Sequence, residues 1–172
     1  YYMIIDPRVL VNCASDIQKL IRKYPKTTFF LRNLQGNESW NPDRFSTVDY
    51  FEDSNNLIIF NTSDMPKRFD KDTNFETLIY WGDVSVCSLQ ILMLLKYEQI
   101  LLLGCDCNYV EKDIVGVTID GIKYVSDSDN DPNHFRPDYF GQGTEYSKPN
   151  RKGHFDSWKK IASDIKLLET AS

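Results

Sequence analysis

Apolar residues in the first part of the chain form short continuous runs that flank one segment with helical spacing. The runs at 1–5, 27–31 and 57–60 are apolar, aromatic and β-branched, which predicts three strands. Between the first two runs, apolar side chains recur at helical spacing from Val9 to Ile21, which predicts a helix over 7–24. This order of strand, helix and strand is typical of α/β domains.

The strongest apolar signal lies between residues 77 and 103. A strand is predicted over 77–81, and the helix predicted over 84–97 is apolar nearly all round, as in a buried helix. The continuous run Ile100-Leu-Leu-Leu103 predicts a central parallel strand. We therefore predict an α/β, three-layer, Rossmann-like fold with a mostly parallel sheet, forming one domain over residues 1–172.

The remaining segments have weaker patterns. Residues 33–53 are rich in Asn, Asp, Ser and Gly, which predicts an irregular excursion. Residues 115–125 alternate around Asp120-Gly121, as in a β-hairpin. Residues 126–150 predict a long loop over the carboxyl-end rim of the sheet, and a C-terminal amphipathic helix is marked by Trp158, Ile161, Ile165 and Leu168.

Composition narrows the function classes. The net charge of −5 argues against a dedicated nucleic-acid binder, which would carry a basic patch. No apolar run is long enough to span a bilayer, so no integral membrane segment is expected. Four cysteines lack the spacing of a disulfide framework, which favours a reduced, cytoplasmic protein. A zinc site that uses the two histidines with Cys105 and Cys107 is an open alternative.

The clearest candidate chemistry lies in the loop segment Asp131-Pro-Asn-His-Phe-Arg-Pro-Asp-Tyr-Phe-Gly141. His134, one of only two histidines, could deprotonate an acceptor hydroxyl as a general base, or could simply hold the loop through a backbone carbonyl. The other histidine, His154, lies near the start of the last helix and is the rival base. The loop residues expected to contact the acceptor are Asn133, Arg136, Asp138 and Tyr139.

Polar residues follow several predicted strands. In open α/β sheets, ligands bind outside the carboxyl ends of the strands, so Asp6, Gly82-Asp83 and Gly104-Cys105-Asp106 are expected on one rim. Gly82 would let a phosphate approach the N–H groups of the following helix. Asp83 could instead be the N-cap of that helix, in which case its carboxylate would occupy those donors. Both interpretations stay open at this point.

The acidic stretch Asp127-Ser-Asp-Asn-Asp131 resembles the start of a calcium loop. Pro132 stands where that loop needs Gly, and Asp138 where it needs Glu, so calcium is not expected. Two interpretations remain: a divalent metal held by Asp127 and Asp129 beside a diphosphate, or a solvated acidic turn.

Several of these motifs resemble one family. Residues 80–160 are similar to the MptE-like domain superfamily of bacterial and archaeal proteins. The similarity lies in the Gly82–Val86 turn, in Ile100-Leu-Leu-Leu-Gly-Cys-Asp106, in Asn108-Tyr109 and in the 131–141 motif. The superfamily is related to bacterial family 42 sialyltransferases and to motility-associated flagellin glycosyltransferases, and other members are hydroxymethylpterin diphosphokinases.

The resemblance to the sialyltransferases implies roles for individual residues. An Asn-Pro that contacts the CMP moiety corresponds to Asp6-Pro7, and the nucleotide-contacting turn corresponds to Asp83, Val84 and Ser85. Trp81 replaces an Arg of the family, and the family's Gly-Ile-Asp corresponds to Gly104-Cys105-Asp106.

The resemblance leaves the catalytic base open. The family's histidine aligns nearest Ser147, with His134 and His154 on either side, and we favour His134. The family also has a strand and a Gly-Asn-Gly-Pro-Ser-like loop before the position of Asp6. The chain as given is therefore expected to be truncated at its N-terminus and to lack part of the donor site.

The resemblance implies a glycosyltransferase of polysaccharide biosynthesis. It would transfer a nonulosonate-type sugar from a CMP-sugar to a surface glycan or protein and would need no cofactor, and a homo-oligomer is one form in which it could act. One alternative is an ATP-dependent 6-hydroxymethylpterin diphosphokinase, which would use Mg²⁺ near Asp127 or Asp129. Another is a non-catalytic module that binds a nucleotide or glycan.

Overall fold

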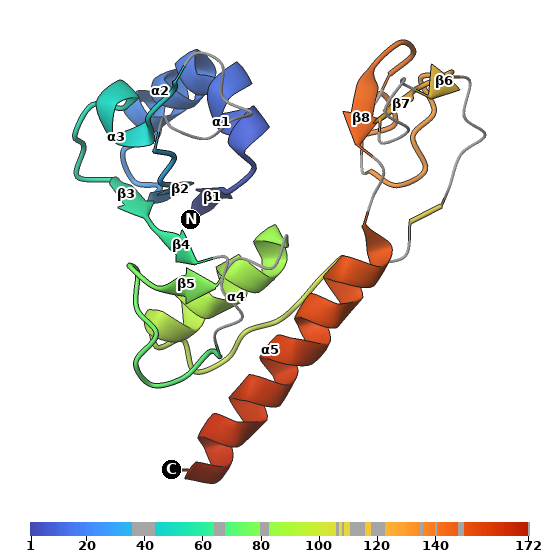
Figure 1. Cartoon of the computed structure of the whole chain (residues 1–172). Coiled ribbons are helices and arrows are strands. Elements are labelled where there is room, and N and C mark those ends of the chain that lie inside the picture. Colours follow the sequence, from blue (N-terminus) through green and yellow to red (C-terminus); the bar gives the residue numbers. More distant parts are fainter. Residues whose placement is uncertain are drawn as a thin grey trace. The chain divides into compact units, whose positions relative to one another are not determined.

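The computed structural model divides the chain into two compact units (Figure 1). Unit 1 comprises residues 1–103 and 157–172, and unit 2 comprises residues 104–156. The single domain expected from the sequence stays a prediction. The structure describes residues 1–35, 44–63, 68–79, 83–105, 107, 109–110, 116–117, 123–134, 136–139, 141–147 and 150–171.

Unit 1 is built on parallel strands. β1 (Tyr2–Ile4), β2 (Phe29–Arg32) and β3 (Leu57–Phe60) form a three-stranded parallel sheet in the order β1-β2-β3. β4 (Thr62–Ser63) and β5 (Leu78–Ile79) form a second parallel pair. The mixed α/β class is confirmed, and apart from the short β4 these strands lie in the segments where apolar runs predict them, with β2 ending one residue beyond its predicted segment 27–31.

Helices connect the strands. α1 (Pro7–Asn12) and α2 (Ala14–Lys23) replace the single helix expected over 7–24. The break at Cys13 is slight, because its N–H still donates to Val9 and its carbonyl accepts from Ile17, both at 2.9 Å. The excursion over 33–53 contains a short helix, α3 (Thr47–Tyr50), with Ser46 as its N-cap.

α4 (Val84–Leu94) ends earlier than the apolar pattern predicts. Lys96 takes a left-handed conformation with φ of 59°, and its N–H donates to the Met93 carbonyl at 2.9 Å. The N–H of Tyr97 donates to the Leu92 carbonyl at 3.2 Å, which completes a Schellman motif. The helix therefore ends three residues before Tyr97, and a lysine occupies the position where glycine is usual.

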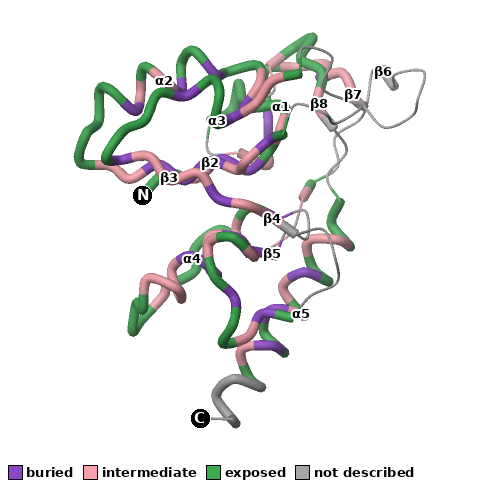
Figure 2. The backbone as a smooth tube through the Cα atoms, turned by 60° about the vertical axis from the view of Figure 1, so that its left-hand side comes forward, coloured by how far each residue is buried: buried purple, intermediate pink, exposed green. Residues whose placement is uncertain are grey.

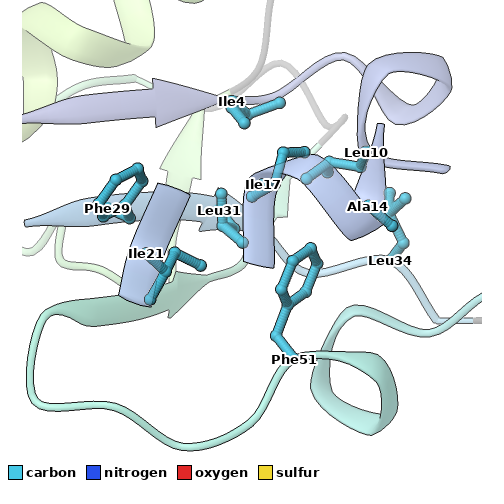
Figure 3. Packing of buried hydrophobic residues seen from close by; sticks show 9 residues of the cluster. All are labelled: Ile4, Leu10, Ala14, Ile17, Ile21, Phe29, Leu31, Leu34 and Phe51. Carbon is cyan, nitrogen blue, oxygen red and sulfur yellow. The ribbon is translucent and has the colours of Figure 1, made fainter. Parts of the chain in front are cut away.

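Both faces of β2 are covered by apolar side chains. Phe29 and Leu31 pack in one cluster with residues of α1 and α2, and Figure 3 shows these side chains together. Phe30 points to the opposite face and packs in a second cluster with Cys87 and Ile91 of α4. The first cluster comprises Ile4, Leu10, Ala14, Ile17, Ile21, Phe29, Leu31, Leu34 and Phe51.

The C-terminal amphipathic helix is confirmed as α5 (Arg151–Ala171), which begins in unit 2 and belongs to unit 1 from residue 157 on. A third cluster joins its Ile161 to Ile79 of β5 and to Val86 of α4. The buried Asp164 carboxylate accepts the Phe69 backbone N–H at 3.0 Å. Figure 2 shows buried positions recurring along α2 and α5 between exposed ones. No helix in the described part of the chain is apolar over a length that could cross a membrane.

The prediction of a central strand at Ile100–Leu103 is wrong. The structure assigns no strand there, and Leu101 and Leu103 are 84% and 96% exposed. Gln90 of α4 is fully buried and bonds both backbone groups of Ile79 in β5, the N–H at 3.0 Å and the carbonyl at 2.9 Å. A strand pairing with β5 at Ile79 would need those same groups.

Unit 2 contains a small antiparallel sheet. β6 (Gly116–Val117) pairs with β7 (Lys123–Val125), which confirms the strands of the predicted hairpin, and its turn lies outside the described residues. β8 (Glu145–Ser147) also pairs with β7, so the interpretation of 126–150 as loop throughout is wrong at this point. A cross-strand pair explains it, since the rings of Tyr124 and Tyr146 lie 5.8 Å apart.

Candidate functional site

The site centres on a carboxylate and an imidazole in the loop after β7. Nδ1 of His134 lies 2.7 Å from Oδ2 of Asp131, and the two side chains are 31% and 2% exposed. The second carboxylate oxygen accepts the Asn133 backbone N–H at 2.9 Å. The Asp131 backbone N–H donates to the Pro137 carbonyl at 2.6 Å, which closes the loop. Asp131 therefore holds both the loop and the histidine.

The contact with Asp131 selects one tautomer of a neutral His134. A carboxylate only accepts hydrogen bonds, so Nδ1 must carry the hydrogen and Nε2 must carry the lone pair. A neutral imidazole in this form can take a proton from a substrate hydroxyl. The candidate base found from sequence thus has an orienting carboxylate. Sequence reasoning did not name that partner, although the Asp-x-x-His spacing carries the signal.

Tyr139 covers the ring of His134. The two rings are stacked, with centroids 4.2 Å apart and planes at 12°. The Tyr139 backbone N–H donates to the Arg136 carbonyl at 3.1 Å, so the loop itself fixes the position of the tyrosine. The stacked ring limits how far the imidazole can rotate out of its bond with Asp131.

Arg136 and Asp138 form an exposed ion pair beside this stack. Nε and one terminal nitrogen of Arg136 donate to the two carboxylate oxygens at 2.6 and 2.9 Å. The hydrogen bond from Arg136 lowers the pKa of Asp138, and the same bond raises the pKa of Arg136. Arg136 and Asp138, two of the four residues predicted to contact an acceptor, thus bind each other in this structure.

The side chain of Asn133 connects the loop to Val110. Its Oδ1 accepts the Val110 backbone N–H at 2.6 Å, and its Nδ2 donates to the Val110 carbonyl at 2.9 Å. The amide satisfies both backbone groups of one residue, as a neighbouring strand would. Asn133 was predicted as an acceptor contact, and its side chain here ties the loop to the segment at 109–110.

The rival histidine has a different partner. Nδ1 of His154, in the first turn of α5, lies 3.3 Å from the Tyr109 hydroxyl, with ring centroids 5.9 Å apart. Ser147, the position nearest the family's histidine, lies in β8. Both histidines belong to unit 2, and Tyr109 directly precedes the residue that Asn133 binds.

Two of the three predicted donor-binding carboxylates, those of Asp6 and Asp83, cap helices. Asp6 accepts the Arg8 N–H at 2.8 Å at the start of α1. Asp83 accepts the N–H groups of Ser85 and Val86 at 2.7 and 3.4 Å. The N-cap interpretation of Asp83 is therefore confirmed, and its carboxylate occupies donors that a phosphate at this helix start would need.

The thiol of Cys87 lies one turn into α4. Burial raises its pKa to about 12, and the nearby Asp83 carboxylate adds to the effect. This cysteine is therefore a neutral core residue rather than a nucleophile.

The expected common rim is not tested by the described residues. Asp6 and Asp83 belong to unit 1, whereas Gly104 and His134 belong to unit 2, and each unit is described by itself. Gly104 has a left-handed backbone with φ of 72°. Gly82 and Asp106 lie outside the described residues.

The acidic stretch at 127–131 is occupied by internal contacts. Asp129 accepts the Gln142 backbone N–H at 2.9 Å, and Asp131 binds His134. A Cβ at Gly141 would lie 2.9 Å from Oδ1 of Asp129, so a larger residue there would make the Asp129 side chain shift. The described residues contain no group of three or more His, Cys, Asp or Glu side chains placed to hold a metal ion. The backbone contact of Asp129 favours an acidic turn over a metal ligand at this position.

Comparison of the chain with family models, curated proteins and solved structures found no match. The resemblance to the MptE-like superfamily therefore depends on the quoted motifs alone and stays a prediction.

Proposed function

We propose that the chain is a group-transfer enzyme in which His134 acts as general base on an acceptor hydroxyl. The observation that carries the proposal is the 2.7 Å contact between Nδ1 of His134 and the buried Asp131 carboxylate. A carboxylate in this place holds the tautomer that accepts a proton at Nε2, and it stabilises the imidazolium that forms.

The proposed reaction is glycosyl transfer. The acceptor oxygen bonds to the anomeric carbon of the donor sugar while its proton moves to Nε2 of His134. The bond between that carbon and the phosphate oxygen breaks, and CMP leaves with the electron pair. His134 then returns its proton to water. The motifs that resemble family 42 sialyltransferases favour a nonulosonate-type sugar on CMP and a glycan or protein acceptor.

The fold gives partial support to this proposal. Apolar clusters on both faces of β2 are compatible with the Rossmann-like layering expected of such transferases. Contacts of the donor with Asp6, Ser85, Gly104 and Asp106 stay predictions. Because Asp83 occupies the first N–H groups of α4, we expect the phosphate to bind elsewhere unless that cap opens.

The test is CMP release from CMP-sialic acid, with water or a glycan as acceptor, in the presence of EDTA. We expect release by the unaltered protein, and a loss of about 10²-fold or more in His134→Gln, the usual contribution of a general base. Arg22→Gln, which removes an exposed ion pair with Glu52 in unit 1, is the matched control and should keep full activity.

Two outcomes would overturn the proposal. A strict requirement for a divalent metal with turnover of ATP would favour the diphosphokinase alternative. Binding of CMP without release, at an affinity that His134→Gln leaves unchanged, would favour a non-catalytic binding module.

A further inference from the structure

We infer that the two histidines of unit 2 are held in opposite tautomers. In this arrangement His154, positioned by Tyr109, donates a hydrogen bond from Nε2 to an anionic oxygen of the substrate. This inference deepens the proposed function and depends on it for the identity of that oxygen. The two histidines then have separate roles, with His134 as the base and His154 as a hydrogen-bond donor.

His134 is held with its hydrogen on Nδ1. The Asp131 carboxylate at 2.7 Å has no hydrogen to donate, so the imidazole must supply it. A neutral His134 therefore presents the lone pair of Nε2, the form needed by a base.

His154 is held the other way round. A neutral imidazole nitrogen without hydrogen is a good acceptor, and a phenol is a better donor than acceptor. The Tyr109 hydroxyl at 3.3 Å therefore donates to Nδ1, which leaves the hydrogen on Nε2. The distance is at the long end of the range for hydrogen bonds, so this tautomer is held less firmly than that of His134.

One short segment connects the two histidines. Tyr109 contacts His154, and the next residue, Val110, is bonded through both backbone groups to the side chain of Asn133. The backbone N–H of Asn133 in turn donates to Asp131, the partner of His134. A continuous series of contacts thus runs from one imidazole to the other within a single unit.

Two opposite tautomers suit the two ends of a transfer reaction. The lone pair on His134 takes the proton of the acceptor hydroxyl. The N–H of His154 hydrogen-bonds the phosphate oxygen that gains negative charge as CMP leaves, without giving up its proton. Tyr109 is a positioning residue in this scheme, since it acts only through His154.

Nitrogen-15 NMR of the imidazole rings tests the tautomers on the protein alone. The chain has only two histidines, so His134→Gln and His154→Gln assign every signal. At a pH where both rings are neutral, we expect the hydrogen on Nδ1 in His134 and on Nε2 in His154. The same tautomer in both rings would overturn the inference.

Because the Nε2–H form is also preferred by neutral histidine in water, Tyr109→Phe carries the test for His154. We expect this change to shift the Nδ1 resonance of His154 while the nitrogen shifts of His134 change less. Tyr97→Phe is the matched control, since it removes a hydroxyl that bonds Tyr1 in unit 1 and should move neither histidine. Unchanged His154 shifts in Tyr109→Phe would contradict the positioning role.

The activity assay separates this inference from the proposed function. We expect His154→Gln to reduce CMP release about 100-fold, and Tyr109→Phe to reduce it about threefold to tenfold. Release that depends on His134 but not on His154 would overturn the inference and leave the proposed function intact. Opposite tautomers without any CMP release would overturn the proposed function and leave the inferred tautomers intact.

Discussion

The two units differ in the contacts that stabilise each of them internally. Among the described residues, all three clusters of buried apolar side chains lie in unit 1. Where burial is described in unit 2, the buried residues are polar instead, namely Ser126 and Asp131. Apolar burial is non-directional, whereas hydrogen bonds need defined partners and angles. The printed contacts around the proposed base in unit 2 are directional hydrogen bonds, and the proposed chemistry lies in that unit.

The largest expected effect is the loss of a core side chain in unit 1. Phe60 is 0% exposed at the end of β3 and packs in the second cluster. We expect Phe60→Ala to lower the free energy of unfolding by about 3–5 kcal/mol, because it removes buried surface and leaves a cavity. Chemical denaturation measures this. Val48→Ala, on the exposed side of α3, is the control and should change stability by less than about 0.5 kcal/mol.

A smaller and more local effect is expected in unit 2. Asp131→Asn replaces a carboxylate that accepts from both His134 and the Asn133 backbone. The amide oxygen can still accept one of these two hydrogen bonds, but the amide nitrogen cannot accept the other. We therefore expect about 1–3 kcal/mol of local destabilisation. Amide hydrogen exchange should show faster exchange at 126–147 and unchanged protection in β1, β2 and β3. Equal loss of protection in both units would contradict the contrast between them.

The contrast between apolar burial and directional hydrogen bonds also determines what could be predicted from the sequence. Strand β3 occurs where the apolar run Leu57–Phe60 predicts it, because a strand of a parallel sheet typically leaves a continuous apolar run. The strand expected at Ile100–Leu103 is absent, and the side chain of Gln90 bonds the backbone groups of Ile79 in β5 that a strand pairing there would need. An apolar run shows which residues are apolar. It does not show whether a single side-chain amide takes the backbone hydrogen bonds that a neighbouring strand would make.

The site was predicted only in part for a related reason. A histidine among prolines and carboxylates pointed to His134, and the loop does place that histidine against Asp131. The roles of Asn133 and Tyr109 depend on contacts between residues far apart in sequence, at 2.6 Å for Asn133 with Val110 and 3.3 Å for Tyr109 with His154. Such contacts leave no spacing pattern in a loop, so sequence alone could not assign them.

A weaker effect still is expected from the exposed ion pair of unit 2. The hydrogen bond from Arg136 lowers the pKa of Asp138, so the pair stabilises the fold above the ordinary carboxyl pKa of 3.8. That contribution disappears as the pH falls through the lowered pKa of the folded protein. We expect Arg136→Gln to return the pKa of Asp138 towards its ordinary value, as measured by NMR titration of the carboxyl carbon. An unchanged titration would show that the pair does not persist in solution.

The smallest effect is expected where the apolar pattern and the structure disagree most. Leu101 is apolar but 84% exposed, so Leu101→Ser removes little buried surface. We expect the free energy of unfolding to change by less than about 0.5 kcal/mol, as is usual for surface positions. Ile100 is the matched comparison, because it packs against the third cluster and its replacement by Ser should cost clearly more. A loss of about 2 kcal/mol or more at Leu101 would instead place this residue in a buried strand, as its sequence pattern predicts. The comparison of the two neighbouring positions therefore tests whether the apolar core of unit 1 ends at Ile100.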